Sequence, residues 1–180
     1  MKFLDLFRKK KVIKTGNPVI DFYNRYDEDG RLLKRSRMPE YLITMRYIEK
    51  YLKPDSKILE IGAGTGRYSI ALAEKGYDVT SVELVPHNLD IMKKKVKPEH
   101  RIQIHEGNAC DLSFLDDNTY DIVLLLGPMY HLFNEEDKHK ALSEALRVAK
   151  RGGIIYTSYC NNDTSVYKFF YTNRVLKFVD

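Results

Sequence analysis

The sequence has few cysteines, and they are poorly placed for cross-links or metals. Its two cysteines, Cys110 and Cys160, are far apart and lack the spacing of metal ligands. The pattern therefore supports neither a disulfide framework nor a zinc site, and we predict no bound metal. Both thiols are expected to be reduced, as is usual in cytoplasmic proteins.

Apolar stretches of the length that secretion or membrane insertion requires are also missing. The first residues, M-K-F-L-D-L-F-R-K-K-K, are interrupted by Asp5 and lack a signal-peptide core. No window approaches the roughly 20 apolar residues of a membrane span. Because 180 residues suffice for one sizeable core but not for two, we expect one globular cytoplasmic unit with no membrane span.

Positive charge is concentrated at one end of the chain. Residues 1–40 contain eleven Lys and Arg against six Asp and Glu, a local sum of +5 that equals the net charge of the whole sequence. The excess lies at residues 8–11 and 31–37. Such an arm could contact RNA phosphates or an anionic membrane, but a solvated surface segment is the commoner outcome of a charge run. RNA is therefore a partner that we do not favour.

The most specific pattern is the segment K-I-L-E-I-G-A-G-T-G-R. A short apolar run there predicts a buried parallel strand, and three glycines let the backbone turn tightly and approach a ligand before a helix begins. These residues are Ile58, Leu59 and Ile61, followed by Gly62, Gly64 and Gly66. The glycine spacing differs from the G-x-G-x-x-G of dinucleotide-binding proteins. Glu60 would repel a pyrophosphate but suit a ligand with an ammonium group, which favours S-adenosylmethionine over NAD.

The motif E-I-G-A-G-T-G resembles the first motif of class I S-adenosylmethionine-dependent methyltransferases. The resemblance implies that the cofactor is held by Glu60, Gly62, Ala63, Gly64 and Gly66. A second match is the predicted strand at residues 77–82, with Glu83 at its end and Leu84 beside it. Glu83 lies about twenty residues past the loop, where nucleotide-binding folds place the acid that accepts ribose hydroxyls.

The third match, H-E-G-N-A-C-D-L, is similar to the family's adenine-reading loop. The resemblance assigns cofactor contacts to Asn108, Ala109 and Cys110. Family members commonly have an acid where this chain has Asn108, and a neutral acceptor makes a weaker hydrogen bond than a carboxylate. We interpret Cys110 as a small packing residue and not as a nucleophile.

The fourth match is the apolar run Y-D-I-V-L-L-L-G-P-M-Y-H-L-F, which breaks at Gly127-Pro128. Ligands of open parallel sheets bind beyond the carboxyl ends of strands, so Gly127 is a cofactor contact and the residues after it should face the reacting groups. Tyr130 and His131 are candidate catalytic residues that could take or relay a proton. Alternatively, His131 holds the loop by a local hydrogen bond and Tyr130 only shapes the pocket.

The sequence of this run resembles that of a broad subgroup of small-molecule bacterial methyltransferases. The N/D-P-P-Y/F signature of enzymes that methylate adenine or glutamine amines is missing, which favours a small-molecule acceptor. Before the first strand, the resemblance implies a helical lid over the site, and Tyr23 and Tyr26 are its candidate residues. Ordinary helix packing explains these two tyrosines equally well.

The order of patterns predicts the fold class. Strand and helix alternate after residue 57, which predicts an α/β fold with a doubly wound, mostly parallel sheet, Rossmann-like as in the methyltransferases. We divide the chain into residues 1–40, a basic arm and candidate lid, and residues 41–180, the cofactor-binding domain. A helix is expected from Pro39 through Leu52, and Lys150–Gly153 should end the helix before the last strand.

The C-terminal part departs from the family pattern of seven strands. A fifth strand is expected at residues 154–160, and the remaining residues are too few for the final antiparallel pair. The fold should therefore be C-terminally curtailed, with an open sheet edge. We expect either a truncated chain or a homodimer that covers this edge, while residues 165–179 could form a helix or part of a lid.

Three function classes follow. The first is a small-molecule methyltransferase, the second an RNA methyltransferase that docks through the basic arm, and the third a non-catalytic S-adenosylmethionine-binding protein. An NAD enzyme is a distant fourth, because the glycine spacing and Glu60 both oppose it.

Overall fold

The structure, a computed structural model, describes residues 15–32, 34–35 and 38–159. The basic cluster at residues 8–11, Cys160 and the predicted segment 165–179 lie outside the described residues. The elements, in chain order, are α1 (Pro18–Tyr23), α2 (Glu28–Leu32), α3 (Met38–Glu49), β1 (Lys57–Ile61), α4 (Arg67–Glu74), β2 (Asp78–Glu83), α5 (Pro86–Lys95), β3 (Ile102–Glu106), β4 (Tyr120–Leu125), the short 3-10 helix η2 (Pro128–Tyr130), α6 (Glu135–Val148) and β5 (Ala149–Thr157).

The strands form one parallel sheet in the order β3-β2-β1-β4-β5. This arrangement confirms the predicted α/β fold with a doubly wound sheet. The order reverses next to β1, because the chain first builds β2 and β3 on one side of it and then adds β4 and β5 on the other. Ligands of such sheets bind where the order reverses, beyond the carboxyl ends of the strands.

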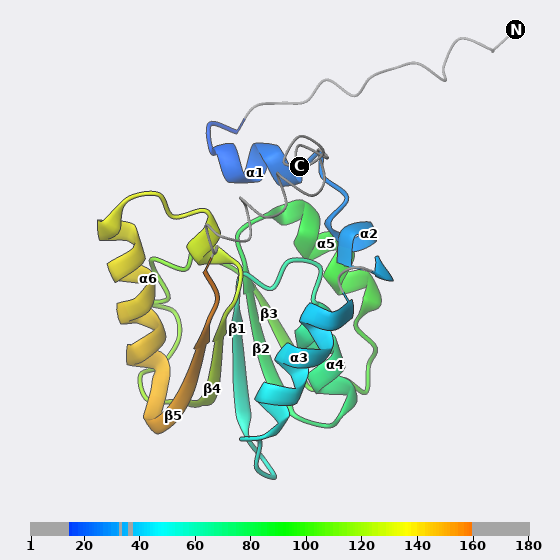
Figure 1. Cartoon of the computed structure of the whole chain (residues 1–180), viewed down its shortest axis with the longest axis vertical. Coiled ribbons are helices and arrows are strands. Elements are labelled where there is room, and N and C mark those ends of the chain that lie inside the picture. Colours follow the sequence, from blue (N-terminus) through cyan, green and yellow to red (C-terminus); the bar gives the residue numbers. More distant parts are fainter. Residues whose placement is uncertain (1–14, 33, 36–37, 160–180) are drawn as a thin grey trace, which may run out of the picture.

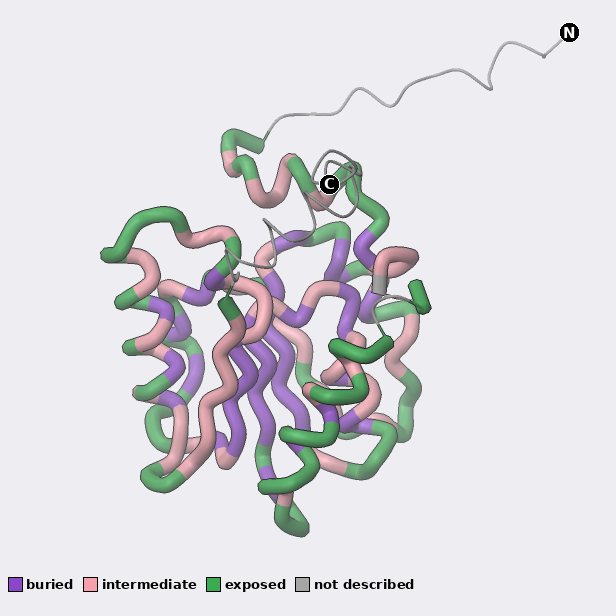
Figure 2. Tube along the Cα trace, in the orientation of Figure 1, coloured by how far each residue is buried: buried purple, intermediate pink, exposed green. Residues whose placement is uncertain are grey.

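The sheet is covered on both faces, and successive residues of each strand point to opposite sides. Leu59 and Val123 pack with α6, whereas Ile58 and Ile122 pack with α3 and α4. Figure 1 shows α6 on one side of the sheet and α3, α4 and α5 on the other. The central strands β1, β2 and β4 are the most continuously buried part of the described chain, as Figure 2 shows, whereas the edge strands β3 and β5 are partly exposed. Coverage of both faces explains the mostly apolar sequence of the central strand β4, YDIVLL, whereas β2, DVTSVE, also buries the polar Thr80 and Ser81.

Two predicted boundaries need correction. The helix that begins near Pro39 ends at Glu49 and not at Leu52, although Met45 and Ile48 are buried as expected from the periodicity. The segment Lys150–Gly153 does not form a turn before the last strand, because β5 already begins at Ala149. Ala149 pairs with Tyr120, and an irregularity in the register follows before regular pairing resumes.

The edges of the described sheet are β3 and β5. Five strands are described where the family pattern has seven, and the expected C-terminal curtailment stays a prediction because residues 160–180 lie outside the described part of the chain. Whether a homodimer covers the β5 edge stays a prediction. Among the described residues, no helix has the length and apolar character needed to cross a membrane.

Candidate functional site

The site is built from loops at the carboxyl ends of the central strands. Residues 62–66 follow β1, residues 84–85 follow β2 and residues 126–131 follow β4. Helix α1 lies across the same end of the sheet, so the N-terminal segment covers these loops (Figure 1). The structure thus brings together segments more than 100 residues apart in sequence.

The glycine loop is required both by backbone conformation and by packing. Gly62, Gly64 and Gly66 all have positive φ, at 75°, 57° and 83°, a region that other residues rarely adopt. A Cβ on Gly62 would lie 2.6 Å from the ring of Pro128, and one on Gly66 would lie 2.6 Å from Met92. Gly64 differs, since the nearest atom to its Cβ position is 3.8 Å away. The loop is therefore tightly packed at both ends and more open at Gly64.

Glu83 lies at the end of β2 and is oriented by the glycine loop. Its side chain is buried, at 5% exposure. One carboxylate oxygen accepts the amide of Gly64 at 2.7 Å, and the other accepts the amide of Val85 at 2.9 Å and the Asn88 side-chain nitrogen at 3.3 Å. Burial raises the pKa of this carboxyl, although these hydrogen bonds oppose the shift. A carboxylate offers about four acceptor positions, so capacity remains for a hydroxyl-bearing ligand.

Asn88 is a site residue that the sequence patterns did not reveal. It is 2% exposed, and its side-chain oxygen has no hydrogen-bond partner among the described residues. A buried acceptor without a donor is costly, so this atom points to a ligand or to water as its partner. Its position beside Glu83 fits the ribose of a nucleoside cofactor, whose hydroxyls can donate to both side chains. Its only sequence signal is its place one turn into the helix after β2.

Glu60 lies beneath the glycine loop. Its side chain is 3% exposed and accepts hydrogen bonds from the amide of Ser69, at 2.9 Å, and from the Ser69 hydroxyl. The hydroxyl of Ser81 donates in turn to Ser69 at 2.7 Å. Burial raises the Glu60 pKa to about 7. These bonds fasten α4 to β1, and a direct contact between Glu60 and an ammonium group stays a prediction.

The predicted adenine loop follows β3. Asn108 is exposed, and its side-chain oxygen accepts the amide of Cys110 at 3.0 Å, while Ala109 is buried. The Cys110 thiol is 3.4 Å from the carbonyl oxygen of Asp137, and burial raises its pKa. These contacts agree with Cys110 as a packing residue. Leu84 is half-buried, and its contact with a cofactor stays a prediction.

Tyr23, a candidate lid residue, lies next to His131, a candidate residue for proton transfer. The Tyr23 hydroxyl lies 3.0 Å from Nε2 of His131, and their ring centroids are 5.4 Å apart. Burial raises the pKa of Tyr23 to about 12 and lowers that of His131, so both side chains are neutral near pH 7. Tyr130 is 38% exposed, and Gly127 packs against the backbone of Gly62.

Helix α2 adds charged residues that the sequence reasoning did not single out. Glu28 is buried and pairs with Arg31. Asp29 accepts the Thr65 hydroxyl at 2.9 Å and pairs with Lys95. Thr65 belongs to the glycine loop, so the N-terminal segment is bonded directly to it. No local motif marks Asp29, because its partners Thr65 and Lys95 lie far along the chain.

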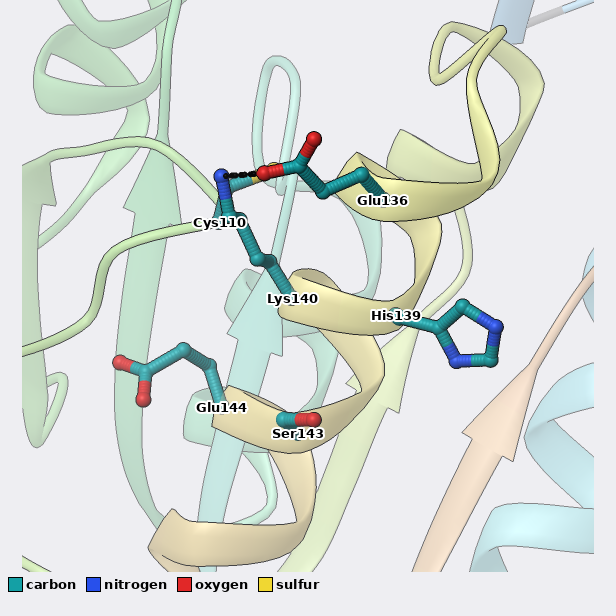
Figure 3. Close-up of a pocket in the computed structure, with 6 residues that line it drawn as sticks. All are labelled: Cys110, Glu136, His139, Lys140, Ser143 and Glu144. Atoms are coloured by element: carbon teal, nitrogen blue, oxygen red, sulfur yellow. Dashed lines mark ion pairs between the residues drawn. The ribbon is translucent and has the colours of Figure 1, made fainter.

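A separate hollow of about 430 Å³ lies on the outer surface of α6 (Figure 3). Its lining consists of Cys110, Glu136, His139, Lys140, Ser143 and Glu144. The Lys140 ammonium lies 2.8 Å from the Glu136 carboxylate, so these two charges in the lining of the hollow pair with each other. The hollow shares only Cys110 with the predicted cofactor residues. Among the described residues, no group of three or more His, Cys, Asp or Glu side chains could hold a metal ion.

A glycine loop after β1, a buried acid at the end of β2 and a reversal of strand order beside β1 are together typical of a nucleoside-binding α/β domain. The family comparison is more specific. The model of the methyltransferase domain family matches residues 58–153, more than half of the chain. The chain belongs to this family, and the predicted resemblance to class I methyltransferases is confirmed.

Curated relatives and solved structures agree with this assignment. The chain is 36% identical over 115 residues to a demethylmenaquinone methyltransferase of Lysinibacillus sphaericus, covering 62% of this chain and 47% of that protein. It is 34% identical over 110 residues to a glycine/sarcosine N-methyltransferase of Parasynechococcus marenigrum, covering 59% and 38%. The match therefore spans less than half the length of either relative.

A SAM-dependent methyltransferase structure from Methanosarcina mazei superimposes with a TM-score of 0.61 at 24% identity. The superposition covers 71% of this chain and 64% of that one. At this identity the likeness concerns the fold alone.

Proposed function

We propose that this chain binds S-adenosylmethionine at the carboxyl ends of its central strands and transfers the methyl group to a small-molecule acceptor. The observation that carries the proposal is the Glu83 carboxylate, which is buried after β2 and held by the Gly64 amide of the glycine loop. Ribose hydroxyls are the natural donors to an acid at this position. Asn88 supplies a second buried acceptor beside it.

Other parts of the site support the same ligand. The loop after β1 would cradle the cofactor, its adenine would lie towards the loop after β3, and Gly127 would border the methyl group. The cofactor residues that we propose are Glu60, Gly62, Ala63, Gly64, Gly66, Glu83, Leu84, Asn88, Asn108, Ala109, Cys110 and Gly127. Glu60 would act from below, by fixing the first turn of α4 through Ser69.

S-adenosylmethionine, when bound, supplies a methyl group activated on a sulfonium. The chain contributes alignment, which for well-oriented reactants reaches effective molarities of up to ~10⁸ M. An amine or hydroxyl acceptor must also lose a proton. His131 is the residue that we propose for this step, since it is neutral at pH 7 and its ring is oriented by Tyr23. Tyr130, on the same turn, is the alternative.

We infer that the N-terminal segment, within residues 1–40, is a lid as well as a basic arm. Residues of α1 and α2 contact the glycine loop and the turn after β4, which would enclose a small acceptor. Arg31, one of the basic residues, is paired with Glu28 and is thus less available to RNA phosphates. We therefore keep a small molecule as the acceptor, and with two separate cysteines we propose a cytoplasmic location.

The test is a calorimetric titration of the full chain with S-adenosylmethionine and with NAD, repeated on Glu83→Gln. We expect S-adenosylmethionine to bind and the variant to lose roughly 1.5–3 kcal/mol of binding free energy, the range for hydrogen bonds to charged groups. Glu99→Gln, at an exposed position, is the matched control. Binding of NAD without binding of the sulfonium ligand would overturn the proposal, and binding without turnover on any acceptor would favour a non-catalytic protein.

A further inference from the structure

Helix α2 presents a tightly paired acid and base beside the glycine loop. The Arg31 Nε donates to one Glu28 oxygen at 2.8 Å, and its Nη2 contacts the other. The Glu28 side chain is only 9% exposed and that of Arg31 is 25% exposed. A two-pronged guanidinium–carboxylate pair of this kind is among the strong charged interactions in proteins.

The pair lies over the open part of the predicted site. Glu28 Cγ is the nearest atom to the Cβ position of Gly64, at 3.8 Å. The pKa of Tyr23, raised chiefly by burial, is raised further by Glu28 and Glu83 and lowered by Arg31. Burial lowers the pKa of His131, and Glu28 partly offsets this shift by raising it. Tyr23, Glu83 and His131 therefore share one electrostatic environment with the Glu28–Arg31 pair.

The pair is not needed to attach α2 to the domain. Asp29 already accepts a hydrogen bond from Thr65 and pairs with Lys95, and the Lys95 ammonium also lies 3.4 Å from the Thr65 carbonyl. Asp29, the residue next to Glu28, thus attaches α2 to the glycine loop and to α5. Glu28 and Arg31 can exchange partners without releasing the helix.

We propose that Arg31 binds the carboxylate and Glu28 the ammonium of the amino-acid end of S-adenosylmethionine, the internal pair opening as the ligand enters. An α-amino acid carries both charges on one carbon, so it can replace each partner of the pair at once. The planar guanidinium fits a carboxylate through two parallel hydrogen bonds. This assignment rests on the proposed cofactor site and identifies which end of the ligand the lid would hold.

Glu28 also fits the ammonium better than the other two buried acids do. Both oxygens of Glu83 already accept hydrogen bonds from the loops that it joins. Glu60 is bonded to Ser69 beneath the loop. Only Glu28 has a partner, Arg31, that the ligand itself can satisfy.

The experiment compares ligands that differ at this end. Calorimetry of the full chain would use S-adenosylhomocysteine, which has the whole amino-acid end, decarboxylated S-adenosylmethionine, which lacks only the carboxylate, and 5′-methylthioadenosine, which lacks both charges. The variants are Arg31→Gln and the double variant E28Q/R31Q, in which no buried charge is left unpaired. Arg25→Gln, at an exposed position of the same segment, is the control.

We expect Arg31→Gln to weaken S-adenosylhomocysteine by roughly 10- to 150-fold, the range for a hydrogen-bonded charge, and the two other ligands by less than about 3-fold. E28Q/R31Q should weaken decarboxylated S-adenosylmethionine as well as S-adenosylhomocysteine, because Glu28 no longer holds the ammonium, and should change 5′-methylthioadenosine by less than about 3-fold. Arg25→Gln should leave all three affinities unchanged. An equal loss for every ligand, or no loss, would overturn the assignment while leaving the cofactor proposal intact. Failure of the unmodified chain to bind any of the three would overturn both.

Discussion

Glu60 offers a test of how the glycine loop is supported. Its carboxyl is almost completely buried, accepts two hydrogen bonds from Ser69 and has a pKa raised by burial to about 7. An unfolded glutamate has a pKa near 4.5. Between these two pH values the folded chain therefore holds a proton that the unfolded chain releases.

The sign of the effect follows from proton binding. Stability falls as pH rises wherever the folded state binds more protons than the unfolded state. The difference between 4.5 and 7, at about 1.36 kcal/mol per pKa unit, amounts to about 3 kcal/mol. Most of this, about 2–3 kcal/mol, is lost between pH 5 and pH 8. Glu60→Gln cannot ionise and escapes this loss.

The assay is urea unfolding of both proteins at pH 5, 6, 7 and 8. Groups elsewhere in the chain titrate in both proteins and cancel in the comparison. We expect the variant to gain about 2–3 kcal/mol in free energy of unfolding relative to the unmodified chain as pH rises from 5 to 8. The exposed substitution Glu99→Gln should show no such trend. If the variant does not gain free energy of unfolding relative to the unmodified chain as pH rises, the reasoning is refuted.

Two further predictions concern packing and the lid, both measured by urea unfolding. Gly62→Ala should cost about 2–4 kcal/mol, because its Cβ would meet the proline after β4 at a positive φ, whereas Gly76→Ala, at φ 90° in open space, should cost only about 1–2 kcal/mol. Equal costs would contradict the packing argument. Tyr23→Phe should cost about 1 kcal/mol through loss of the His131 contact, and Tyr26→Phe, at a 37% exposed ring, less. Similar losses at the two tyrosines would show that the His131 contact contributes nothing.

The fold class and the buried central strands were predictable because their signals are local. Ile58 and Val123 lie in apolar runs of strand length, and a parallel sheet buried on both faces selects such runs. The start of β5 was not predictable. Charged residues and a glycine pair at Lys150–Gly153 look like a turn, but the pairing of Ala149 depends on Tyr120 of the neighbouring strand.

The candidate site likewise has a part that the sequence predicts and a part that it does not. The glycine loop and Glu83 form a compact motif, so their predicted roles follow from spacing together with the family resemblance. The contact of Tyr23 with His131 joins residues 108 positions apart, and Glu28 reaches Gly64 only because α2 docks on the loop. Such contacts depend on how a separate segment packs, for which the sequence of that segment carries no periodic or motif signal.

The preference for a cationic cofactor follows from the arrangement of three acids and not from Glu60 alone. Glu28 raises the pKa of Glu83, and Glu83 raises that of Glu60, in both cases on top of the effect of burial. The three carboxylates therefore repel one another around the glycine loop, with Arg31 as the counter-charge of Glu28. A ligand with a net positive charge relieves this repulsion, whereas a pyrophosphate would add to it. Because relief favours the ionised acids, binding of the cation should release protons near pH 7. Its affinity should consequently rise between pH 6 and pH 8, and an affinity that falls over that range would contradict this account of the selectivity.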